Sequence, residues 1–142
     1  MVELLIAMTI LVILSLVTLN YFGDYARQQQ FQRFTEDVGH NISLARQQTL
    51  ASKDDMVYGL YVGTSTVELF SGPTPVPGDA GNTIIDFSAA AYTATSSFSG
   101  GLWHTTFSRI SGEATATGTI VLSNSDIGKT ATYTIYQSGL VE

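Results

Sequence analysis

The first 22 residues of the chain are almost entirely apolar. Residues 4–19 carry no charge, and Glu3 is the only charged residue before Asp24. An apolar run of this length predicts a helix of about 24 to 28 Å, at about 1.5 Å per residue, which barely matches a bilayer core of roughly 30 Å. Because this helix is apolar on every side, it has to be covered by lipid or by other copies of itself. The side chains expected to be covered are Leu4, Leu5, Ile6, Met8, Ile10, Leu11, Val12, Ile13, Leu14, Leu16, Val17 and Leu19.

After Gly23 the pattern becomes amphipathic. Apolar residues now recur at spacings of three and four, which is typical of one helix face packed on a core. The stripe expected to pack on the following domain consists of Phe31, Phe34, Val38, Ile42 and Ala45, and it continues to Thr49. We therefore expect the helix to end near Ala51. Glycine is unfavourable inside a helix by about 1 kcal/mol relative to alanine, so Gly23 is a possible hinge, and the pattern is equally compatible with a continuous helix.

Beyond Lys53 the period changes to that of strands. Residues 57–62 and 66–70 flank the turn residues 63–65 and predict a hairpin. All three prolines lie in residues 71–79, which predicts an exposed loop. Further strands are expected at residues 83–87, 91–98, 103–110, 117–122 and 131–136. The predicted fold is α+β: a long N-terminal helix (residues 1–52) packed on an antiparallel sheet of about six or seven strands, the globular domain 53–142.

Composition excludes several functions. Six Lys and Arg against twelve Asp and Glu give a net charge of −6, which argues against general nucleic-acid binding through phosphate contacts. With no cysteine there is neither a disulfide framework nor a thiolate zinc site. His40 is expected on a solvated helix face, and His104 is expected to be structural. No nucleophile-elbow or phosphate-binding motif occurs, so we expect no enzymatic activity, no metal and no cofactor. Trp103 is expected in the core rather than in a subunit contact.

The opening residues 2–8, VELLIAM, resemble the start of the type IV pilin superfamily, which includes type IV pilins and type II secretion pseudopilins. In that family a prepilin peptidase cuts after a glycine and methylates the new first residue, and a glutamate stands at the fifth mature position. Here Glu3 stands third, so the first two of the four residues that precede the glutamate in the family pattern, a Phe-Thr-like pair, have no counterpart in this sequence. The resemblance implies that Glu3 pairs with the amino terminus of a neighbouring subunit.

Later residues show a looser resemblance to the GspH/FimT-type branch of minor pilins. This resemblance covers mainly the end of the helix and the late strands. The residues that carry it are Ala45-Arg46, Phe107, Gly112, residues 118–122, residues 134–136 and Gly139. This match rests on common residue types. It favours a minor subunit without deciding between the branches of the superfamily.

The resemblance implies a structural subunit of a type IV pilus-like filament. The subunit would be inserted in the inner membrane before assembly, where the prepilin peptidase and the pilus or secretion assembly machinery act on it. It would then polymerise into an extracellular helical homo-oligomer whose core is the apolar helix. Adhesion, motility and uptake are all compatible roles. The alternatives are a minor pilin or type II secretion pseudopilin, a membrane-anchored binding module, and an enzyme on a membrane anchor.

Overall fold

The computed structural model describes residues 2–88 and 91–142. The side chains of residues 16–22 also lie outside the described set, and with them three of the expected core positions, Leu16, Val17 and Leu19. The chain forms two compact units, Met1–Arg33 and Phe34–Glu142. Residues 34–50, the last third of the helix, therefore belong to the same unit as the strands.

A single long helix, α1 (Val2–Leu50), opens the chain. It contains no proline, and its first half is rich in leucine and isoleucine, which favour or tolerate helix. Gly23 lies within α1. The helix ends where Ser52 adopts a left-handed backbone conformation (φ 50°), and a short 3₁₀ turn, η1 (Lys53–Asp55), follows. The end lies one residue before the expected position.

Seven antiparallel strands follow the helix, and they form two sheets. The first sheet has the order β3-β2-β1-β5, and the second has the order β4-β6-β7. The expectation of a single sheet was therefore wrong, because β4 pairs with β6 instead of its neighbour β3. The strands are β1 (Tyr58–Val62), β2 (Thr66–Ser71), β3 (Thr83–Asp86), β4 (Tyr92–Phe98), β5 (His104–Thr106), β6 (Gly118–Asn124) and β7 (Lys129–Ile135).

The predicted hairpin is confirmed as β1 and β2, with Val62 opposite Val67 and Leu60 opposite Leu69. The strand expected at residues 103–110 is shorter, because the chain turns back and Phe107 pairs with Ala114 in an isolated bridge. Trp103 was expected in the core, yet its side chain is 52% exposed. It lies before β5 begins, and its backbone carbonyl accepts a 2.8 Å hydrogen bond from Val62 N–H.

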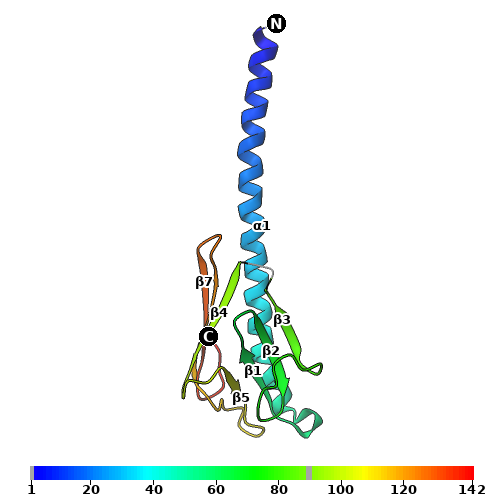
Figure 1. The fold of residues 1–142 in the computed structure, drawn as a ribbon, viewed down its shortest axis with the longest axis vertical. Helices are drawn as coiled ribbons and strands as arrows, with labels where there is room; N and C mark the ends of the chain where they lie inside the picture. The colour runs from blue at the N-terminus through cyan, green and yellow to red at the C-terminus, as the bar shows by residue number, and fades with distance from the viewer. Residues whose placement is uncertain (1, 89–90) are drawn as a thin grey trace. The chain divides into compact units, whose positions relative to one another are not determined.

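The core of the second unit lies between α1 and the two sheets, whose strands gather around the cyan part of α1 in Figure 1. Phe34 packs its ring on Tyr92 (centroids 4.9 Å apart, stacked) and on Phe87 (5.0 Å, edge-on). Thr49 accepts a 2.9 Å hydrogen bond from Tyr58 N–H and so joins the last helical turn to β1. The helix residues buried in this unit are Phe34, Val38, Ile42, Ala45 and Thr49; Phe31, the first residue of the expected stripe, belongs to the first unit and is also buried.

Candidate assembly segment and polar clusters

Residues 2–15 of α1 form a segment whose apolar side chains are exposed. We call it the apolar segment. Its large apolar side chains are between 53% and 72% exposed; they are Val2, Leu4, Leu5, Ile6, Met8, Ile10, Leu11, Val12, Ile13 and Leu14. Exposed apolar surface of this extent marks a site that contacts a protein or a membrane.

The hydroxyl groups of the apolar segment are satisfied by the helix itself. Thr9 Oγ1 donates to the carbonyl of Leu5, and Ser15 Oγ donates to that of Leu11 at 2.8 Å. Both bonds reach back four residues, a usual arrangement for these side chains in helices. Covering the segment with apolar material therefore leaves neither hydroxyl without a partner.

Glu3 is the one charged side chain of the apolar segment, and it lies in the first turn of α1. Within the part of the chain that the structure describes, Glu3 takes part in no ion pair. A carboxylate moved into an apolar surrounding is strongly destabilised unless it is paired. If the apolar segment is covered, the Glu3 carboxylate therefore needs a cationic partner or has to be protonated.

Gly23 begins a polar stretch of α1. Asp24 and Arg27 approach to 3.8 Å on the helix surface, and Gln29 Nε2 donates to the Tyr25 hydroxyl at 2.8 Å. This stretch is exposed, and it marks where the apolar part of the helix ends.

None of the helices that the structure describes combines the length and the apolar character needed to span a bilayer.

In the second unit, a carboxylate that the sequence did not single out holds the proline-containing loop. Glu68 on β2 is only 3% exposed. Its Oε2 accepts hydrogen bonds from Gly78 N–H and from Asn82 Nδ2, both at 2.9 Å, and its Oε1 accepts from Thr66 Oγ1 at 3.2 Å. Asn82 Nδ2 also donates to the carbonyl of Val76 at 2.9 Å. The loop is therefore fastened to the sheet by one buried acid.

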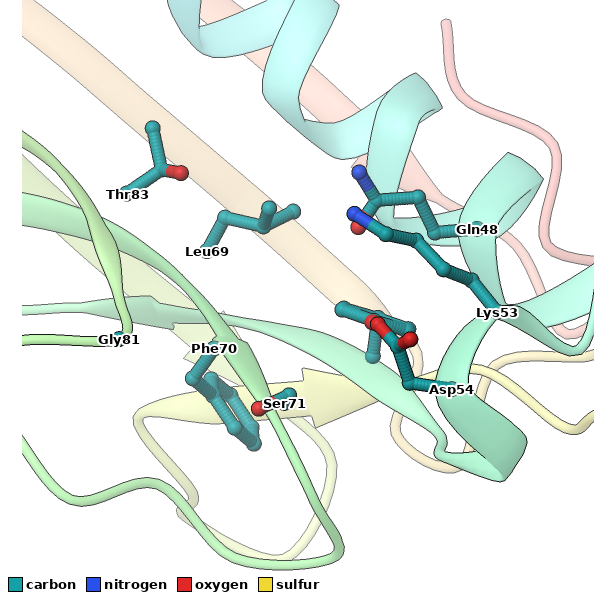
Figure 2. A pocket seen from close by; sticks show the side chains of 9 residues that line it. Gln48, Lys53, Asp54, Leu69, Phe70, Ser71, Gly81 and Thr83 are labelled. Carbon is teal, nitrogen blue, oxygen red and sulfur yellow. The ribbon is translucent and has the colours of Figure 1, made fainter.

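A second polar cluster lines a pocket of about 220 Å³ (Figure 2). Gln48 and Lys53 extend into it from the helical side, toward Leu69 of β2. The Tyr58 hydroxyl donates to Asp54 Oδ2 at 3.1 Å. Burial raises the pKa of the Tyr58 phenol, and the hydrogen bond and the charge of Asp54 raise it further. The remaining lining residues are Phe70, Ser71, Gly81 and Thr83.

Neither histidine lines this pocket. His40 is exposed on α1, and the half-buried His104 ring meets the Phe70 ring edge-on, with centroids 6.1 Å apart. Among the described residues no group of three or more histidine and carboxylate side chains could hold a metal ion.

No protein-family model and no curated protein matches the sequence. Among solved structures, the fold is similar to the crystal structure of the type IV minor pilin FimU from Pseudomonas aeruginosa, with a TM-score of 0.61. The sequences are 17% identical, and the alignment covers 83% of this chain and 90% of that chain. The expected fold class, an N-terminal helix packed on antiparallel strands, is confirmed. At this identity the likeness establishes the fold.

Proposed function

We propose that the protein is a structural subunit of a type IV pilus-like extracellular filament and polymerises through the helix of residues 1–22. The observation that carries the proposal is the apolar segment with its single carboxylate, on a chain whose fold resembles that of a minor pilin. No soluble arrangement of one copy covers such a segment, whereas a bundle of copies does. The role is structural rather than catalytic.

Glu3 is proposed to pair with the amino terminus of an adjacent subunit. In the water-poor core of a bundle an unpaired carboxylate is unfavourable by several kcal/mol, so only the register that brings the two charges together is stable. The pair would thus align each arriving subunit with its neighbours.

Before assembly, the subunit is proposed to reside in the inner membrane through the same helix. The hydroxyl groups of Thr9 and Ser15 are bonded within α1, which suits lipid as well as a helix bundle. While the subunit is in the membrane, a prepilin peptidase is expected to cleave and methylate it. The pilus or secretion machinery is then expected to extract it for assembly.

A minor pilin, or a type II secretion pseudopilin of GspH/FimT type, is the second candidate. The likeness to a minor pilin favours it. A minor subunit uses the same helix but is present in few copies, so the two candidates differ in stoichiometry rather than in chemistry.

The test is to shear surface filaments from producing cells and to quantify their proteins by mass spectrometry. If this chain is the dominant protein, it is the main subunit; if it makes up a few per cent, it is a minor subunit. The mass of the N-terminal peptide reports whether a methylated residue is present. A chain that remains entirely in the membrane fraction, while filaments form without it, would contradict both candidates.

A further inference from the structure

Another pocket, of about 210 Å³, lies between the last turns of α1 and the C-terminal residues. It is lined by Ser43, Arg46 and Gln47 of the helix and by residues 139–141. Arg46 is the only charged residue in this lining, so the pocket carries one positive charge in a chain whose net charge is −6. A pocket lined by charge of one sign attracts ligands of the opposite sign, which here means an anion.

Two glycines allow the Arg46 side chain to lie against the backbone. Gly112 and Gly139 both have positive φ (67° and 74°), and a Cβ atom on them would stand 3.2 Å and 2.8 Å, respectively, from Arg46 Nε. Because neither residue has a side chain, the guanidinium group reaches the carbonyls of both turns. Arg46 Nε donates to the carbonyl of Gly112 at 3.3 Å, and Nη2 donates to that of Ser138 at 3.4 Å. One edge of the group is therefore held in place.

The other edge of the Arg46 guanidinium group has no acceptor among the residues that the structure describes. Of the five N–H groups of an arginine, the two carbonyls use the one on Nε and one on Nη2. The edge formed by Nη1 and Nη2 is left over. Arg46 also pairs with no carboxylate in the described part of the chain, although its side chain is partly buried. Such an edge binds a carboxylate through two parallel hydrogen bonds.

The C-terminal side of the pocket is apolar. It consists of Gly139, Leu140 and the half-buried Val141, and Leu140 is 59% exposed. An aliphatic group next to the anionic group of a ligand would cover Leu140 and remove apolar surface from water. A phosphate has no such group, and its second charge finds no second cation in this lining. At about 210 Å³ the pocket is smaller than the roughly 300–1,000 Å³ of drug-sized sites, so it suits a small ligand or the end of a larger one.

We infer that this pocket binds a carboxylate that carries a short aliphatic group. The carboxylate accepts from the Nη1 and Nη2 edge of Arg46, and the aliphatic group packs on Leu140. A free carboxylic acid and the C-terminal residue of a peptide share this chemistry. The inference depends on the pocket alone, so it stands whether or not the chain assembles into a filament.

The test is an NMR titration of the full chain in a nonionic detergent, followed at the backbone amide resonances of Gly112 and Gly139. The probes are isovalerate, as a free acid, and acetyl-glycyl-leucine, as a peptide end. Each is compared with its neutral amide, which has the same aliphatic group without the charge, and with inorganic phosphate. Because both glycines lie beside Arg46, their resonances distinguish binding in the pocket from uptake of a probe by the detergent or by the apolar segment.

Two variants change the pocket in different ways. Arg46→Gln removes the guanidinium group. Leu140→Glu keeps Arg46 but places a competing carboxylate beside it, at a position exposed enough to accept the change. Arg33→Gln, at an exposed arginine of the same helix, and Val76→Glu, at an exposed position of the proline-containing loop, make the same charge changes outside the pocket.

At least one of the two carboxylates is expected to bind about tenfold or more tightly than its amide and than phosphate. Each pocket variant should weaken this binding about tenfold or more, as is usual for loss of a charged hydrogen-bond partner, and the two control variants should bind like the wild type. Tighter binding of acetyl-glycyl-leucine than of isovalerate assigns the site to a peptide end, and the reverse assigns it to a free acid.

The inference is overturned if neither carboxylate shifts the two glycine resonances, or if an amide or phosphate binds as tightly as the carboxylates. It is also overturned if the pocket variants bind as well as the controls. Circular dichroism of each variant separates loss of binding from loss of folding.

Discussion

The phenolic hydroxyl of Tyr133, on β7, donates a 2.6 Å hydrogen bond to the backbone carbonyl of Thr35 in α1. The same ring lies over Gly39, where a Cβ atom would stand 3.0 Å from the Tyr133 hydroxyl oxygen. The second sheet therefore packs directly on the helix backbone. This close approach is possible because Gly39 has no side chain.

Burial raises the pKa of the Tyr133 phenol above its ordinary value of 10.0; a hydrogen bond with the Thr35 side chain lowers it, and the charge of Glu36 raises it. The phenol thus ionises more readily in the unfolded chain, so the stability it contributes is complete below pH 10 and decreases as the pH rises further. Tyr133→Phe should reduce the free energy of unfolding by about 1 kcal/mol at pH 8.

The difference between Tyr133→Phe and the wild type should shrink between pH 8 and pH 11, measured by urea unfolding at both values. Tyr25→Phe is the comparison, because Tyr25 is exposed and its hydroxyl bonds to Gln29 one turn along the same helix. A constant difference across this pH range would contradict the assignment.

Two isoleucines provide a matched test of the core. Ile42 on α1 is fully buried, whereas Ile110 is 95% exposed. Ile42→Ala leaves a cavity and should reduce the free energy of unfolding by about 2 to 5 kcal/mol. Ile110→Ala removes the same atoms from water and should change it by less than about 0.5 kcal/mol. Denaturant unfolding of both variants checks the difference, and similar losses would mean that the helix stripe is not part of the core.

Much of this fold could be predicted from the sequence because its periodicities are simple. Spacings of three and four placed Phe34, Val38 and Ile42 on one buried face. The strand-like runs on either side of the turn residues 63–65 predicted the hairpin of β1 and β2. Alternation identifies strands but does not name their partners, so the division into two sheets could not be foreseen.

The buried acid Glu68 was missed, because burial of a charged side chain depends on partners distant in the sequence. Glu68 lies in a strand whose neighbours Val67 and Leu69 are buried, and nothing local shows that the loop ten residues later would cover it. Trp103 is the converse case. Its size favoured the core, but its position before β5 leaves the ring uncovered.

Glu68→Ala should release the proline-containing loop. The amide of Gly78 and the side chain of Asn82 would lose their common acceptor, and a hydrogen bond to a charged group contributes about 1.5 to 3 kcal/mol. Hydrogen exchange at the Gly78 amide is expected to accelerate by at least tenfold, measured by NMR. Glu113→Ala, at an exposed position, should leave this exchange unchanged; equal exchange in both variants would show that Glu68 does not hold the loop.

Two glycines with positive φ separate backbone strain from steric conflict. Gly139 has φ 74°, and a Cβ atom there would stand 1.9 Å from the carbonyl oxygen of Gly112; Gly128 has φ 61° and open space around it. Gly128→Ala should reduce the free energy of unfolding by about 1 to 2 kcal/mol, which is the left-handed penalty alone. Gly139→Ala should reduce it by about 3 kcal/mol or more, because overpacking adds to that penalty. Thermal and urea unfolding of the two variants measure the two changes in the free energy of unfolding. Equal decreases would rule out the close contact at Gly139.

The proposed assembly role is tested most directly at Glu3. Glu3→Ala removes the only charge of the apolar segment, so we expect membrane insertion to persist. Incorporation into sheared filaments should decrease at least tenfold, because the neighbour's amino terminus would be left unpaired in an apolar core. Asp24→Ala is the matched control, since Asp24 is an exposed acid on the same helix, outside the apolar segment. Quantitative mass spectrometry of the filament and membrane fractions distinguishes the outcomes. Normal incorporation of Glu3→Ala would contradict the pairing while leaving a role for the apolar side chains, whereas equal losses in both variants would indicate a general defect of the helix.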